Sequence, residues 1–332
     1  MFNYDYVVSK IHAIHSKSFL GENFKKLTKI SSIERLHKEL FPKDNEIVLT
    51  KKLYTRIEKL FKEKTYKEIN NIAKFFNYRN KFINNIILKY EIDNLKIIVK
   101  TYLSGLSKIS DLFEIKLDKT LDYQLIYDSD MSDIKNVQKV LKKTVFKFIL
   151  PMLEEKKPDY IIENALDKFY YRNFIDSLNE LQNEEKQKIY LILKEEMNWQ
   201  NILWAFRVKL YYGKSFKELE DTFLNEKGLI SLELIKNISD LQFIPGEPNR
   251  VFRDFPKNYS DIILKSFTED GDVDLPLLEK RAITRLSEHY LKYFYIGEEI
   301  LPIISFIYIK QNEYNNIVKL VESLRYNLPI EN

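Results

Sequence analysis

Apolar residues along this chain recur three or four positions apart, the spacing that places them on one face of an α-helix. In residues 4–20, for example, Val7, Ile11 and Ile14 share one face. A second, short helix follows Ser32 and stops at Pro42, because proline cannot continue a helix. The same spacing predicts further helices at residues 51–62, 66–87, 134–152, 160–181, 184–197, 277–295 and 301–325.

Polar and proline-containing stretches separate these segments. A charged break is expected between residues 62 and 66. Asp130 and Asp133 are of the residue type that caps a helix N-terminus, which suits the start of the helix at residue 134. Residues 243–248 and 268–274 form the most loop-like part of the chain.

One pattern occurs three times within the predicted helices. An Asn is followed at once by an apolar residue, two more apolar residues come four and five places later, and a Glu or Asn stands three places before. The three copies are centred on Asn94, Asn201 and Asn316. Positions one, four and five form a stripe that faces a core.

Each copy ends at a residue suited to terminate a helix, and the copies lie far apart. Gly105, Gly213 and Asn327 stand where a left-handed residue is expected. The copies are separated by roughly 110 residues, which is too long for a short solenoid repeat and suits three small helical domains in one chain. We therefore predict three helical units, at residues 1–106, 107–214 and 215–332.

Glycine and proline are scarce, with 7 Gly and 9 Pro among 332 residues, against usual shares of about 7% and 5%. Sheets need many turns, whereas long helices joined by short loops need few. The composition therefore favours an all-α fold. Apolar residues make up 45% of the chain, which suffices for one large core or several smaller ones.

The charge is nearly balanced, since 53 basic and 49 acidic residues leave a net charge of +4. The chain has no long Lys/Arg block, so no nucleic-acid partner is expected. It has no Cys, which excludes disulfides and thiolate metal sites. We see no signal peptide and no apolar run long enough to span a membrane, so any membrane association is expected to come through partners or the surface.

The segment Gly213-Lys214-Ser215 matches the end of a phosphate-binding P-loop. The motif requires a Gly five places earlier, where this chain has Val208, and it should follow a strand rather than an amphipathic helix. We interpret Gly213 as a helix stop and expect no direct nucleotide binding. The alternative, an enzyme that binds a nucleotide through Lys214, would lose that binding in Lys214→Ala.

Other candidate sites have simpler explanations. His12 and His15 lie one helical turn apart and could share a metal ion, but no third ligand stands nearby. Residues 270–274 contain three Asp residues in the manner of a calcium loop, without its Gly at the sixth place or its Glu at the twelfth. We predict no catalytic residue, no cofactor and no metal site.

The repeated Asn residues are interpreted as structural anchors, because an Asn at the edge of a core can bond a neighbouring backbone and fix its register. A contact with a partner is the alternative. Lys100, Arg207 and Lys209 lie near the helix ends. There they favour the negative end of the helix dipole or present positive charge to a partner, and both interpretations stay open.

Several stretches occur around the anchors in a characteristic order: residues 4–11, the segment Leu166-Asp167-Lys168-Phe169-Tyr170-Tyr171, and residues 302–317. In this order they resemble the family of C subunits of prokaryotic V/A-type rotary ATPases, whose eukaryotic members are called d subunits. The resemblance covers essentially the whole chain.

The resemblance implies that the three units are related by pseudo-threefold symmetry and close into a funnel. It also implies a non-catalytic rotor subunit at the cytoplasmic face of a prokaryotic membrane. Such a subunit joins the central shaft, formed by the D and F subunits, to the membrane ring of proteolipid subunits, and transmits torque for ATP-coupled proton or sodium transport. The alternative is a free-standing α-helical adaptor that binds peptides or protein partners.

Overall fold

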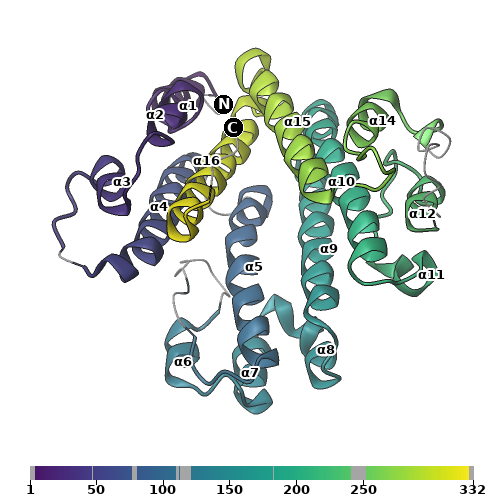
Figure 1. The fold of residues 1–332 in the computed structure, drawn as a ribbon, viewed down its shortest axis with the longest axis horizontal. Helices are drawn as coiled ribbons and strands as arrows, with labels where there is room; N and C mark the ends of the chain where they lie inside the picture. Colours follow the sequence, from purple (N-terminus) through teal and green to yellow (C-terminus); the bar gives the residue numbers. More distant parts are fainter. Residues whose placement is uncertain are drawn as a thin grey trace. The chain divides into compact units, whose positions relative to one another are not determined.

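The computed structural model describes residues 4–46, 48–76, 81–109, 112, 121–181, 183–240 and 252–328. Within these ranges every regular element is a helix (Figure 1). An isolated antiparallel bridge between Phe267 and Val273 closes the predicted loop at residues 268–274. The all-α prediction is confirmed. The other predicted loop, residues 243–248, lies outside the described residues.

Contacts divide the chain into two compact units, Met1–Lys156 with Leu291–Asn332, and Lys157–Tyr290. The first unit contains α1 (Tyr4–His15), α2 (Glu22–Leu27), α3 (Ile33–Leu40), α4 (Thr50–Ala73), η1 (Lys74–Phe76), α5 (Lys81–Leu103), α6 (Tyr123–Asp128), α7 (Ile134–Leu141), η2 (Val145–Ile149), α8 (Leu150–Glu154) and α16 (Leu301–Tyr326). The second contains α9 (Asp159–Ser177), η3 (Leu178–Glu180), α10 (Asn183–Leu210), α11 (Phe216–Leu219), η4 (Glu220–Thr222), α12 (Leu232–Asp240) and α14 (Lys257–Leu264). Helix α15 (Leu275–Ile296) begins in the second unit and ends in the first. The prediction of three units that close into a funnel stays a prediction.

The predicted helix ends are formed by local chemistry. Ser32 accepts the Arg35 N–H at 3.3 Å at the start of α3, and Asp133 accepts the Lys135 N–H at 2.9 Å at the start of α7. Each satisfies a backbone donor that the first helical turn leaves without a partner.

The three helices that carry the anchor pattern, α5, α10 and α16, are each followed by a left-handed residue, as predicted. The φ angles are +67° at Gly105, +56° at Gly213 and +53° at Asn327. A left-handed residue turns the chain so that the last helical carbonyls find donors: the Leu106 N–H reaches the Thr101 carbonyl at 3.0 Å and the Leu328 N–H reaches the Ser323 carbonyl at 2.9 Å.

Some predicted boundaries were wrong. The charged break at residues 62–66 does not exist, because α4 continues through it. Lys64 is partly buried there, with its Nζ 4.8 Å from the ring centroid of Phe19 and 5.1 Å from that of Phe61. A long aliphatic stem can cover apolar surface while its charge stays near water, so a charged residue need not end a helix.

Two further segments are shorter than expected. The single helix expected at residues 134–152 is divided into α7, η2 and α8, because the Thr144 hydroxyl accepts the Phe146 N–H at 3.1 Å and starts a new turn. Helix α1 ends at His15, and Gly21, with φ of +54°, precedes α2 rather than terminating α1.

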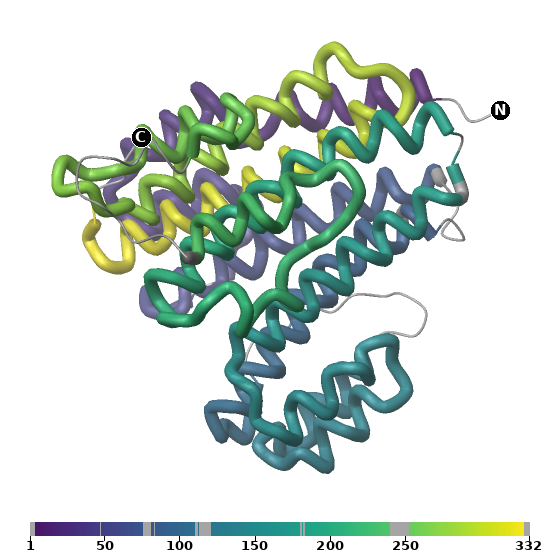
Figure 2. The backbone as a smooth tube through the Cα atoms, turned by 90° about the vertical axis from the view of Figure 1, so that its right-hand side faces the viewer, coloured from purple at the N-terminus to yellow at the C-terminus, as the bar shows by residue number. Residues whose placement is uncertain are grey.

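The core of the first unit joins its two chain ends. Helix α16 lies against α4, and Figures 1 and 2 both show this C-terminal helix beside the N-terminal third of the chain. The buried side chains of this core include Leu36, Leu40, Leu53, Ile57, Phe61, Ile317, Leu320 and Val321.

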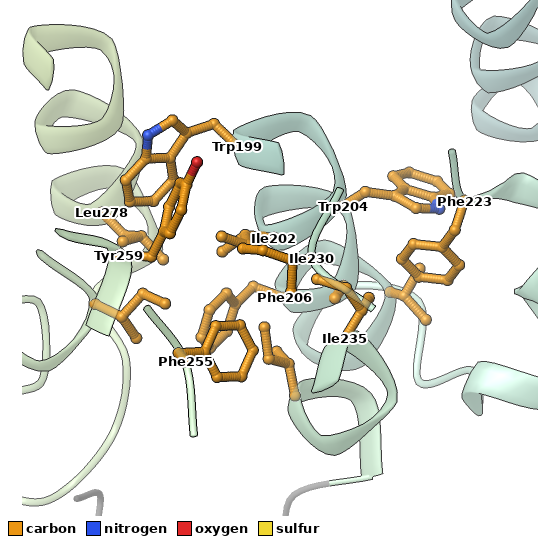
Figure 3. Close-up of a cluster of buried hydrophobic side chains, with 14 of the residues drawn as sticks. Trp199, Ile202, Trp204, Phe206, Phe223, Ile230, Ile235, Phe255, Tyr259 and Leu278 are labelled. Carbon is orange, nitrogen blue, oxygen red and sulfur yellow. The ribbon is translucent and has the colours of Figure 1, made fainter. Parts of the chain in front are cut away.

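The core of the second unit is built around α10. Figure 3 shows the ring of Trp199 beside that of Tyr259, and the two ring centroids are 5.2 Å apart in an edge-to-face arrangement. Trp204 donates its indole N–H to the Thr222 hydroxyl at 2.7 Å. Both rings therefore fix the segments that follow α10 onto that helix.

Candidate functional site

The predicted apolar stripe is buried in all three copies of the anchor pattern. Every residue at positions one, four and five after the anchor Asn has an exposed fraction of 0%: Leu95, Ile98, Val99, Ile202, Ala205, Phe206, Ile317, Leu320 and Val321. The anchor face of each helix is therefore turned into a core. Polar residues on the same face must find partners inside the protein.

The most regular polar position lies three residues before each anchor. It holds Glu91, Asn198 and Glu313, whose exposed fractions are 2%, 1% and 0%. In each copy a side-chain oxygen accepts the backbone N–H of a residue just before a short helix. The bonds run from the Leu121 N–H to Glu91 (2.8 Å, before α6), from the Ile230 N–H to Asn198 (2.9 Å, before α12) and from the Phe19 N–H to Glu313 (2.7 Å, before α2).

This shared bond attaches a short helix to a long one in every copy. A buried backbone N–H without an acceptor costs about 1–3 kcal/mol, so the bond also selects where the connecting segment lies. We call Glu91, Asn198 and Glu313 the tether residues. The sequence pattern included these positions, but we predicted the structural role for the anchor Asn residues instead.

The three tether residues differ in charge. Asn198 is neutral, and its amide also donates to the Tyr259 hydroxyl at 2.9 Å. Glu91 has no ion-pair partner in the described part of the chain, and burial raises its pKa to about 7, opposed by the hydrogen bond from Leu121. Glu313 is matched by a buried cation, Lys310.

Lys310 lies at the centre of a buried ionic cluster in the first unit. Its exposed fraction is 1%, and its Nζ contacts the carboxylate of Glu313 and lies 2.6 Å from that of Glu68. The Ser18 hydroxyl is 3.5 Å from the same nitrogen. The cluster thus joins α16, α4 and the segment between α1 and α2, which are distant in sequence.

The anchor Asn residues have unequal roles. Asn201 forms two hydrogen bonds with the backbone of Leu224, donating to its carbonyl at 2.8 Å and accepting its N–H at 2.9 Å. Asn94 donates to the Tyr123 hydroxyl at 3.1 Å. Asn316 is only half-buried.

The three basic candidates lie near the ends of α5 and α10. Arg207 is half-buried and donates to Glu279 of α15 from two nitrogens, at 3.0 and 2.8 Å. Lys209 donates to the Ser239 carbonyl at 3.4 Å. Lys100 is exposed. The structure therefore brings Arg207 and Lys209 to the second unit, with Arg207 in an internal ion pair, and places Lys100 in the first.

A network that the sequence did not reveal surrounds α10. The Tyr259 hydroxyl donates to Glu195 at 2.6 Å, and the Tyr290 hydroxyl donates to Glu196 at 3.2 Å. Burial, together with these carboxylates, raises the pKa of both tyrosines well above the usual value. Contacts between residues this far apart leave no local pattern in a sequence.

The remaining candidates have structural partners. Lys214 pairs with Glu218 at 2.9 Å, and the Ser215 N–H also bonds Glu218 in the capping box of α11. His12 and His15 both pack against Phe294: the His12 ring is tilted, with ring centroids 4.3 Å apart, and the His15 ring is edge-to-face, with ring centroids 4.7 Å apart.

The described ranges contain no group of three or more His, Cys, Asp or Glu residues that could hold a metal ion. None of the helices there is long and apolar enough to cross a membrane.

Comparisons with known proteins agree across nearly the full chain. The family described as ATP synthase (C/AC39) subunit matches residues 7–332. The chain is 23% identical to the C subunit of the A-type ATP synthase of Methanosarcina acetivorans, over 95% of this chain and 87% of that protein. It is 25% identical to the subunit of the same name from Haloferax volcanii, over 95% and 91%, and 23% identical to that of Methanococcoides burtonii, over 99% and 92%.

Proposed function

Because the chain belongs to the ATP synthase (C/AC39) subunit family, we propose that it is the central-rotor subunit of a V/A-type ATPase. In this role it is a non-catalytic socket at the cytoplasmic face of a prokaryotic membrane. It joins the shaft, formed by the D and F subunits, to the membrane ring of proteolipid subunits, and it transmits torque for ATP-coupled transport of protons or sodium ions.

The observation that supports this role is the tether shared by α5, α10 and α16. A part that transmits torque must pass force without yielding, and closely packed helices have low compressibility. In each copy a buried hydrogen bond holds a short helix on a long one. Surface segments attached in this way can carry load from a partner into the long helices.

Because the chain has no Cys, a single introduced Cys is its only thiol and can report on its partners. We would place it at Tyr211, which is 62% exposed and lies two residues beyond Lys209, and at Leu106, which is 58% exposed and follows the end of α5. Leu191→Cys, at a site that is 53% exposed near the other end of α10, serves as the matched control.

In the assembled complex, a thiol-to-amine cross-linker is expected to join Tyr211→Cys or Leu106→Cys to one of the two shaft subunits or to the proteolipid, identified by mass spectrometry. Since all of these turn together, the cross-linked complex should keep its ATP-driven ion pumping. Pumping that stops on cross-linking would place the partner in the stator and contradict the rotor assignment. A chain that never copurifies with the complex would favour the adaptor alternative.

A further inference from the structure

Helix α7 and the turn η2 present an unbalanced basic surface. Residues 135–147 contain five lysines and no acidic residue, although basic and acidic residues are nearly equal in the whole chain. All five are exposed: Lys135, Lys139, Lys142, Lys143 and Lys147. We call this group the α7 lysine face.

These five lysines are not held in ion pairs with the rest of the described chain. None of the five forms an ion pair there, and the one hydrogen bond of their ammonium groups within the described residues runs from Lys139 to the Asn136 side chain at 3.5 Å. Two nearby carboxylates form hydrogen bonds with other groups, since Glu154 accepts from the Gln138 side chain at 2.7 Å and Asp133 caps α7. Some lysines elsewhere on the surface form ion pairs, for example Lys25 with Glu22 and Lys188 with Glu184.

The arrangement exceeds what helix stability requires. Cations are favourable in the last turn of a helix, which accounts for Lys139 and Lys142. The dipole gives no reason for Lys135 in the first turn of α7 or for Lys147 beyond its end. Like charges at this density repel one another, so the face is destabilising until an anion binds it.

The backbone beneath the face is held firmly. Val137, Val140 and Leu141 on the opposite side of α7 are buried, and Phe146 and Ile149 anchor η2 with an exposed fraction of 0%. Among the lysines, Val145 is the one large apolar residue that is exposed, at 48%. The face therefore offers a partner a row of positive charges on a firm backbone, together with one exposed apolar side chain.

We propose that the α7 lysine face is a docking surface for a carboxylate-rich segment of another protein subunit. A helix that binds a lipid surface turns its apolar side toward the acyl chains, whereas the apolar side of α7 is buried in its own core. Membership of an ATP synthase family implies partner subunits. The inference rests on the proposed function only in requiring that the chain be part of such an assembly.

A water-soluble carbodiimide tests the contact directly, because it joins a lysine amine to a carboxylate only where the two touch. In the purified complex, we expect amide links from the α7 lysine face to Asp or Glu residues of one other subunit, mapped by mass spectrometry. If the five lysines form no link to another subunit and react with an amine label equally in the isolated chain and in the complex, the proposal is wrong.

A pair of charge-reversal variants provides the matched comparison. Lys139→Glu/Lys142→Glu/Lys143→Glu changes the face, and Lys26→Glu/Lys29→Glu/Lys38→Glu makes the same change of charge at exposed sites of the first unit. We expect the first variant to weaken incorporation into the complex about tenfold or more and the second to leave it unchanged. Equal unfolding midpoints of the two variants show that both are folded, and equal incorporation would contradict the proposal.

Vesicles of phosphatidylcholine with about 30 mol% phosphatidylserine test the lipid alternative. Binding of the isolated chain to these vesicles that the face variant loses, with no change in incorporation, would overturn the proposal in favour of a membrane contact. Absence of the chain from the complex would instead refute the proposed function. A chain that is present with an unlinked face would refute only this inference.

Discussion

At the scale of single residues, two kinds of side chain perform the same task at the three tether positions. Each tether residue accepts a backbone N–H within a core, and either an amide or a carboxylate oxygen can do so. The three residues differ in the free-energy cost of burying a charge. Asn198 carries none, Glu313 is matched by Lys310, and Glu91 is buried without a cation in the described ranges.

Glu91 therefore makes the stability of the chain depend on pH. Its pKa rises from 4.5 in the unfolded chain to about 7 in the folded one because burial disfavours the charged form. As the pH rises through 4.5 the unfolded state ionises first, so the free energy of unfolding falls until the pH passes about 7. The loss amounts to about 3 kcal/mol.

Glu91→Gln should remove this dependence while retaining an oxygen for the Leu121 N–H. We expect the variant to exceed the wild type in free energy of unfolding at about pH 8 by up to about 3 kcal/mol, with the difference shrinking toward about pH 4. Urea titrations at several pH values measure it. Glu39→Gln, at an exposed site, is the control, and a difference that is the same at every pH would count against the explanation.

The anchor Asn residues provide a second comparison. Asn201→Ala leaves both the N–H and the carbonyl of buried Leu224 without their partner, which should cost about 2–3 kcal/mol of stability. Asn316→Ala, at a half-buried position of the same pattern, should cost less than about 1 kcal/mol. Chemical denaturation measures the free energy of unfolding of the two variants. Equal losses would show that the hydrogen bonds to Leu224 do not contribute to stability.

At the scale of elements, two features recur along the anchor helices α5, α10 and α16. The tether binds each one to a short helix, and a left-handed residue ends it. A Cβ added at Gly105 would meet no atom of a non-neighbouring residue within 4 Å. Its replacement is therefore unfavourable because of the backbone conformation alone.

Gly105→Ala and Asn327→Gly should consequently change stability in opposite directions. The first places Cβ on a residue with φ of +67° and should cost about 1 kcal/mol, whereas the second relieves a non-glycine residue at +53° and should gain a few tenths. Thermal unfolding measures both. A loss in both variants would mean that the Asn327 side chain has a role beyond helix termination.

At the scale of the whole molecule, the two ends of the chain belong to one unit. Phe19 and Glu313 are 294 positions apart and share a hydrogen bond of 2.7 Å. Lys310 closes the same contact, together with Ser18 and Glu68. The short helix bonded to the C-terminal helix α16 therefore comes from the N-terminal part of the chain. The short helices bonded to α5 and α10 come from the segments that follow those helices.

Lys310→Met should destabilise the first unit by about 3–5 kcal/mol, because it leaves the buried carboxylate of Glu313 without a cation. Lys310→Met/Glu313→Gln should recover a large part of this loss, since the amide still accepts the Phe19 N–H and carries no charge. A double-mutant cycle by urea denaturation measures the coupling. Additive effects would show that the two residues do not act as a pair.

Local patterns along the chain were enough to predict the all-α class, most helix positions, the cap at Asp133 and the apolar stripe of the anchor helices. These features depend on residues within a few positions of one another, so a linear pattern records them. Leu95, Ile202 and Ile317 were predicted to face a core, and each is fully buried. The order of the motifs also sufficed to identify the family.

The contacts between distant parts of the chain became known only from the folded structure. The pattern placed Glu91 and Glu313 at the same position of two copies. It did not reveal that Lys310 neutralises Glu313, whereas Glu91 has no cation beside it in the described ranges. It also did not reveal that Arg207 is paired with Glu279. Such contacts join segments brought together by folding, and their energies depend on burial and distance, which no local pattern encodes.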